Sequence, residues 1–208
     1  TCLDCHSGHT TRRNDDPTSP TFPSNVPNLC GRCHREGEKA AQRLPAEFVG
    51  IVASYSESVH GRGLLESGLV VSATCTNCHT AHNPLPPEDP ASSVNAHNIP
   101  DTCGKCHNGV ENEFLKSVHS PLVSKTDLPL PVCSSCHTAH SILRTDENAF
   151  RQDIINTCGK CHEDVTATYF DTYHGKVSKL GADVAARCHD CHGAHDARAV
   201  SDPKSHLS

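Results

Sequence analysis

Residues 133–140 read CSSCHTAH: two cysteines three positions apart, a histidine directly after the second, and another histidine three residues later. The first five letters, C-x-x-C-H, occur seven times in the 208-residue chain and use all 14 of its cysteines. The seven units are Cys2/Cys5/His6, Cys30/Cys33/His34, Cys75/Cys78/His79, Cys103/Cys106/His107, Cys133/Cys136/His137, Cys158/Cys161/His162 and Cys188/Cys191/His192. A recurring unit therefore organises the chain from one end to the other.

C-x-x-C-H is the attachment signature of c-type haem. Two thiols one helical turn apart form thioethers to the porphyrin, and the adjacent histidine ligates the iron as the proximal ligand. The alternatives are zinc ribbons and redox disulfides, but zinc takes Cys and His in fours, and a disulfide has no need of the trailing histidine. The sequence predicts seven covalently attached haem c groups, each with its iron.

The composition suits such a protein better than an ordinary globular domain. Hydrophobic residues make up 35% and aromatic residues 4%, Met and Trp are missing, and 14 Pro and 13 Gly interrupt the chain. Side chains alone would supply little core, so we expect the haems to supply the buried apolar surface. The predicted fold is mostly irregular with a few short α-helices, a haem-templated linear array of repeated haem pairs with little or no β structure.

A second axial ligand for each iron has to be histidine, because the chain contains no Met. Four candidates lie three residues after a proximal histidine: His9, His82, His140 and His195. Three more lie 14 or 15 residues before the next motif: His60, His119 and His174. These seven match the seven motifs in number, which predicts bis-His ligation throughout. His97, His189 and His206 remain as spares.

The motifs recur in pairs within one heptahaem domain, 1–208, whose repeat units span about 1–45, 46–113, 114–165 and 166–208. Helices are predicted over Ala46–His60, ending at Gly61, and over Glu111–His119 and Asp164–His174. Segments 14–29 and 83–101, rich in Pro, Ser and Asn, are predicted as loops, and only 69–71 suggests a short strand.

The simplest pairing assigns each distal histidine to the motif that follows it. The expected pairs are His60–His79, His119–His137, His174–His192, His9–His34, His82–His107 and His140–His162. His6 then lacks a distal ligand, and His195 lacks a haem. Three explanations stay open: His195, His97 or His206 closes the gap within one chain, the His6 haem is five-coordinate and reactive, or a histidine crosses to the next subunit of a head-to-tail polymer.

The C-x-x-C-H motifs, their CHTAH and CGKCH variants and the S-V-H-G segment resemble those of multihaem c-type cytochromes over nearly the whole chain. Within that group the chain is similar to small periplasmic electron-transfer cytochromes and to extracellular filament-forming (nanowire) cytochromes. The latter resemblance implies a continuous haem chain with histidines that cross between subunits. Catalytic multihaem reductases are less similar, since they need an open iron and often an altered motif.

The predicted function is electron transfer as a subunit of an extracellular cytochrome filament, with a monomeric periplasmic shuttle and a reductase with one five-coordinate haem as alternatives. A haem-storage role has no support in the sequence. We expect an exported electron carrier rather than an enzyme, with a head-to-tail homo-polymer and redox proteins or extracellular acceptors as partners. The formal net charge of −6 disfavours nucleic acid, and no stretch is long enough to predict a membrane span.

Overall fold

The computed structural model describes residues 1–182 and 184–208, and it does not describe the side chain of Glu47. The chain divides into two compact units. Unit 1 comprises Thr1–Asn95 and Thr138–Ile142, and unit 2 comprises Ala96–His137 and Leu143–Ser208.

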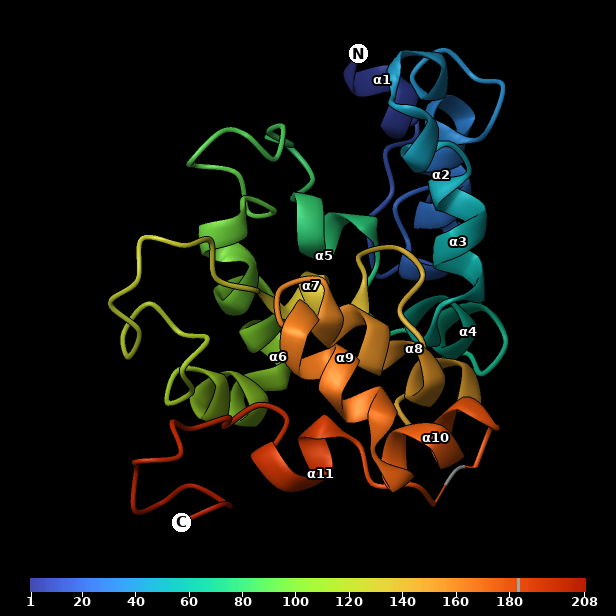
Figure 1. Ribbon diagram of the computed structural model, residues 1–208. Coiled ribbons are helices and arrows are strands. Elements are labelled where there is room, and N and C mark those ends of the chain that lie inside the picture. The colour runs from blue at the N-terminus through green and yellow to red at the C-terminus, as the bar shows by residue number, and fades with distance from the viewer. Residues whose placement is uncertain (183) are drawn as a thin grey trace. The chain divides into compact units, whose positions relative to one another are not determined.

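Unit 1 is a series of short helices, shown in blue to teal in Figure 1. They are α1 (Cys2–Cys5), η1 (Pro23–Asn25), α2 (Val26–His34), η2 (Ala41–Arg43), η3 (Ala46–Phe48), α3 (Ile51–Glu57), α4 (Val59–Leu65) and α5 (Cys75–His79). Helix α2 packs against both α3 and α5.

Unit 2 contains the longer helices, and α8, α9 and α10 follow one another in the orange part of the ribbon (Figure 1). Its elements are η4 (Ala96–Asn98), α6 (Ile99–Phe114), α7 (Cys133–His137), α8 (Asn148–Gly159), α9 (Glu163–Asp171), α10 (Tyr173–Lys179) and α11 (Cys188–His192). Helix α9 packs on α8 and on α10.

The predicted helical and irregular fold is confirmed: helices account for 47% of the chain, and the described residues contain no strand. Residues 69–71, the one stretch that suggested a strand, lie in a turn. None of the described helices combines the length and the apolar character that crossing a bilayer requires.

The predicted helix Ala46–His60 is broken twice, first at Val49 and Gly50 between η3 and α3, and again where Ser58 adopts an extended backbone (φ −70°, ψ 165°). The Ser58 hydroxyl accepts a hydrogen bond from the Gly61 amide and so caps a new helix, α4, which runs through Gly61 to Leu65. Gly61 is therefore inside a helix and not at the end of one, because a serine N-cap took precedence over the glycine stop signal. Thr172 does the same for α10, where its hydroxyl accepts from the Gly175 amide.

The core of side chains is small, as the composition predicts. Among the described residues the buried hydrophobic ones are Val26, Ala41, Val52, Leu64, Ile155 and Ala185. Serines are as prominent inside as these, with Ser58, Ser117 and Ser120 all at most 2% exposed. So few buried hydrophobic side chains make a small core for a chain of 208 residues.

Candidate haem-binding site

Four of the seven motifs form their own short, self-capped helix, and we call these type A. They are the ones followed by a second histidine: Cys2–His9, Cys75–His82, Cys133–His140 and Cys188–His195. In each, the residue before the second cysteine accepts a hydrogen bond from the backbone nitrogen just ahead of the first cysteine. The acceptors are Asp4, Asn77, Ser135 and Asp190. This cap fixes the two thiols on one helical turn, as thioether attachment requires.

The other three motifs, Cys30–His34, Cys103–His107 and Cys158–His162, we call type B. Each begins C-G followed by Arg or Lys and lies at or near the end of a longer helical run rather than in a helix of its own. At His107 and His162 the backbone leaves the helical region (φ −100° and −112°), and a new helical stretch starts directly afterwards. The chain therefore turns at these two proximal histidines.

Thiols of type B motifs lie against thiols of the type A motif that follows in the sequence. The hydrogen-bonded pairs are Cys30–Cys75, Cys103–Cys133 and Cys158–Cys188. This bond lowers the pKa of Cys30 to about 7, with the same effect on Cys133 and Cys188. The pKa of Cys75 is raised, first because it donates that hydrogen bond and then because it is buried. The contacts bring the attachment points of neighbouring motifs together.

The predicted attachment cysteines differ in how far they are exposed. Eight are half-buried, and the other six are exposed: Cys2, Cys5, Cys33, Cys106, Cys161 and Cys191. All three type B motifs thus combine a half-buried first cysteine with an exposed second one.

Cys106 and Cys161 are exposed, as Cys33 is, and each directly precedes a histidine at which the backbone leaves the helical region. Neither cysteine takes part in the contacts that join type B to type A thiols, which use the first cysteine of each motif. Exposure leaves these two thiols accessible for attachment, and they remain predicted haem-binding residues.

In the described part of the chain, predicted iron ligands lie in pairs with nearly equal spacing between ring centroids. The pairs are His6–His82 at 6.2 Å, His79–His140 at 6.1 Å, His137–His195 at 6.0 Å and His119–His162 at 6.3 Å. The first three have ring planes within 20° of parallel, and the fourth is tilted by 48°.

This spacing fits a metal ion between the two rings. A metal–imidazole nitrogen bond is about 2 Å long, and the nitrogen lies roughly 1.1 Å from the ring centroid, so two opposed ligands place their centroids about 6.2 Å apart. Either interplanar angle is acceptable, because each ring is free to rotate about its own metal–nitrogen bond. The histidines present therefore fit the bis-His ligation of a haem iron.

The pairing follows a rule that differs from the one expected from the sequence. The proximal histidine of a type A motif faces the trailing histidine of the next type A motif, as in His6–His82, His79–His140 and His137–His195. His119 faces His162, the type B histidine of its own repeat, and not His137. In consequence His6 and His195, the two unmatched residues in the expected scheme, both have a partner.

Backbone hydrogen bonds between distant segments account for this register. The amide of Val59, next to His60, donates to the carbonyl of Ile142, two residues after His140, at 2.8 Å. The amide of Val118, next to His119, donates to the carbonyl of Ala197, two residues after His195, also at 2.8 Å. Sequence spacing carries no direct signal for a bond that joins residues about 80 positions apart.

The protein environment favours the neutral imidazole that a metal needs. Burial, the largest cause, lowers the pKa of His79, His119, His137 and His140, and a neighbouring histidine lowers each one further. A neutral ring keeps a lone pair for the metal, whereas a protonated ring has none.

Four of the remaining predicted ligands are placed differently. His9, His34, His174 and His192 are exposed, and in the described part of the chain none of the four faces another imidazole at the bis-His spacing. His60 is half-buried near the start of α4, and His107 is exposed at the turn within α6. Of the spares, His206 lies 3.4 Å from Asp196 and His189 lies 3.6 Å from Asp190.

Comparison with protein families gives a match to the family described as "Doubled CXXCH motif", over residues 119–167. This region holds His119, the type A motif at Cys133, the type B motif at Cys158 and the His119–His162 pair. A search of curated proteins finds no match. The doubled motif indicates covalently bound c-type haem and supports a multihaem c-type cytochrome that transfers electrons.

Proposed function

We propose that the chain carries seven bis-His c-type haems and conducts electrons as one subunit of an extracellular cytochrome filament. The observation that carries the proposal is the set of imidazole pairs, 6.0–6.3 Å apart, in register with the C-x-x-C-H motifs. Each haem supplies an iron that accepts and releases one electron, and two histidine ligands keep its reduction potential below that of a His/Met cytochrome.

The chain's own residues connect the attachment sites into a series within each unit. In unit 1 the Cys30–Cys75 contact joins two motifs, and the His6–His82 pair joins the Cys75 motif to the Cys2 motif. In unit 2 the Cys103–Cys133 and Cys158–Cys188 contacts link four motifs in two pairs, and His137–His195 joins the two pairs. Short separations between redox centres are what a conductor needs, and the protein's role is to fix them.

The filament version of the proposal rests on the type A pairing rule. By that rule His192 takes the trailing histidine of a further type A motif, and His9 is a trailing histidine that faces no proximal partner in the described chain. In a head-to-tail contact, His9 of a second copy would pair with His192 of the first. The same contact repeats from copy to copy without closing and so forms a filament. The Tyr173 amide, equivalent to that of Val59, would then donate to the Thr11 carbonyl, two residues after His9.

Native material examined by negative-stain microscopy and size exclusion should consist of filaments. The His9→Ala variant should keep its covalent haems but run as short particles, with one haem becoming high-spin. His206→Ala is the matched control, because that exposed histidine lies outside every imidazole pair, and it should still polymerise. Native protein that runs as a monomer would exclude the filament and leave the periplasmic shuttle.

The exposed position of His192 favours a second candidate function, reduction of a small molecule at a five-coordinate haem. Because His6 faces His82, the candidate for this open site is His192 rather than His6. Addition of CO, cyanide or nitrite should leave the spectrum of native filaments unchanged, since our proposal fills this position with His9. A spectral shift of one haem in intact filaments would support the reductase.

A further inference from the structure

A turn of sequence Asp-Pro-x-Ser occurs three times in the chain, at Asp16–Ser19, Asp89–Ser92 and Asp202–Ser205. In each copy the serine amide donates to the aspartate carbonyl, at 2.8, 2.9 and 2.8 Å. The aspartate carboxylate in turn accepts from the amide two residues ahead, at 2.8 Å in all three. All three serines are buried. The three turns are the same structural element.

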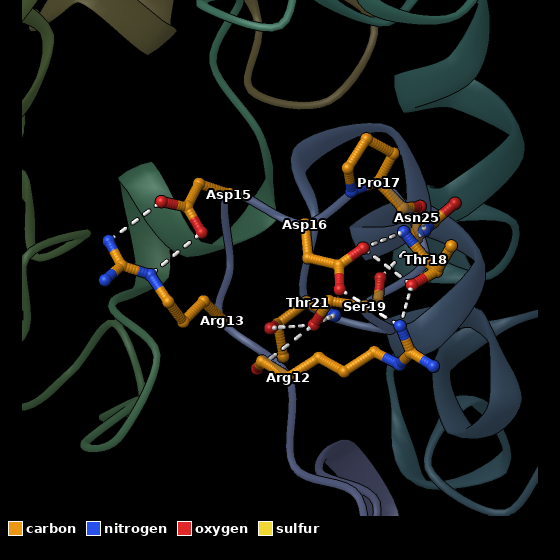
Figure 2. A network of polar contacts seen from close by, with 9 residues as sticks. All are labelled: Arg12, Arg13, Asp15, Asp16, Pro17, Thr18, Ser19, Thr21 and Asn25. Carbon is orange, nitrogen blue, oxygen red and sulfur yellow. Dashed lines mark hydrogen bonds and ion pairs between the residues drawn. The ribbon is translucent and has the colours of Figure 1, made fainter.

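Figure 2 shows the first turn, in which the Asp16 carboxylate receives the Arg12 guanidinium at 3.1 Å and the Thr18 amide and hydroxyl. The third turn repeats this arrangement, with Arg198 bonded to Asp202 at 3.1 Å and the same spacing of four residues. The first and third turns therefore also share an arginine that donates a hydrogen bond to the aspartate carboxylate.

Each turn has a fixed place in the repeat. Its aspartate follows the trailing histidine of a type A motif, His9, His82 or His195, by seven residues. In the first two copies the first cysteine of a type B motif, Cys30 or Cys103, comes 14 residues after that aspartate. In these two copies the turn thus lies between a type A site and the type B site that follows it, and Asp202–Ser205 has the same place after its type A site.

His174 has the position of a leading histidine in the same repeat. It is the second residue of α10 as His60 is of α4, and Tyr169 donates to the Ala186 carbonyl at 2.9 Å as Tyr55 does to Ala73 at 2.8 Å. His119, the leading histidine of the preceding repeat, faces a type B histidine, His162, at 6.3 Å. Because His174 and His119 have equivalent positions in the repeat, we expect His174 also to face a type B histidine.

We propose that His174 is the distal ligand of a type B haem that is held by a motif other than Cys188–His192. The proposal rests on the proposed function in that the motifs must carry haem. The motif that fits is Cys30–His34 of a second copy, because His34 is exposed and faces no leading histidine in the described chain.

The test is His174→Met in the full chain, read by spectroelectrochemical titration and by the absorption band of Met-ligated ferric haem. One haem, about one seventh of the haem absorbance, should titrate at a higher potential, since Met/His ligation raises it. The same substitution is then made in a background with Cys188→Ala and Cys191→Ala, which lacks the His192 haem. The shift should persist there. Its disappearance would overturn the proposal by showing that His174 ligates the His192 iron.

A third background, Cys30→Ala with Cys33→Ala, tests the assignment to the Cys30–His34 motif. The shift should disappear in this background, and its persistence would overturn the proposal. His206→Met is the matched control and should leave all potentials unchanged. An unchanged titration of His174→Met itself would overturn the proposal.

Failure of this inference is distinguishable from failure of the proposed function. If His174→Met shifts no potential while the protein still shows covalently bound, low-spin haem, only the His174 assignment is wrong. If the native chain carries no covalent haem, the proposed function itself is wrong.

Discussion

Replacing His140 with Met should raise the reduction potential of one haem by on the order of 0.2 V, since axial ligands span about 0.8 V in haem proteins. His140 faces His79 at 6.1 Å with ring planes 4° apart, so the affected haem is the one attached at Cys75 and Cys78. A thioether in place of an imidazole stabilises the ferrous state, which raises the potential. Spectroelectrochemical titration of the variant measures the shift.

Two further proteins make this result specific. His206→Met, a Met introduced at an exposed histidine outside the pairs, should leave every potential in place. His140→Met in a chain with Cys75→Ala and Cys78→Ala should show no shifted haem, because the haem that His140 serves has gone. A shift that survives in that background would mean that His140 serves another motif, such as Cys158–His162, and would refute the type A pairing rule.

The Gly61→Ala variant should lose roughly 3 kcal/mol of stability, a cost typical of forced overpacking. A Cβ at Gly61 would overlap the carbonyl oxygen of Tyr55 and the backbone of Ser56, so α3 and α4 would have to separate. That separation would also displace His60, the next residue back along the chain. Chemical denaturation followed by far-UV circular dichroism measures the loss.

Gly109→Ala in α6 is the matched control, because a Cβ there meets nothing within 4 Å. Alanine favours a helix over glycine by about 1 kcal/mol, so this variant should be as stable as the native protein or slightly more so. Equal destabilisation by the two substitutions would show that the close approach of α3 and α4 is unimportant. Gly175→Ala, which meets the Tyr169 carbonyl in the same way, should reproduce the Gly61 result in unit 2.

The haem-attachment motifs could be predicted from the sequence better than the pairing of the histidines. The motif C-x-x-C-H names its own thiols and proximal histidine, because attachment is local chemistry on one helical turn. The helical, strand-free fold also followed from the sparse apolar pattern and the frequent Pro and Gly. The distal pairing did not follow, since His119 and His162 are brought together by contacts such as Val118–Ala197 that join distant segments.

The sequence also carries signals that distinguish the two types of motif. The acceptor before the second cysteine, as in Asp190, marks the self-capped type A motif, and C-G-K-C marks type B. The recurrence of Asp-Pro-x-Ser at a fixed distance from His9, His82 and His195 marks the segment that follows these type A sites. The break at Ser58, by contrast, depends on which of two competing signals is stronger, the serine N-cap or the glycine stop.

The most direct test of the account is the intact mass of the native polypeptide under denaturing conditions, where only covalently attached groups remain. We predict that residues 1–208 carry the mass of seven haems, one for each C-x-x-C-H motif, and that tryptic peptides containing each pair of cysteines bear one haem. A polypeptide without added mass, or with zinc released on denaturation, would contradict the account.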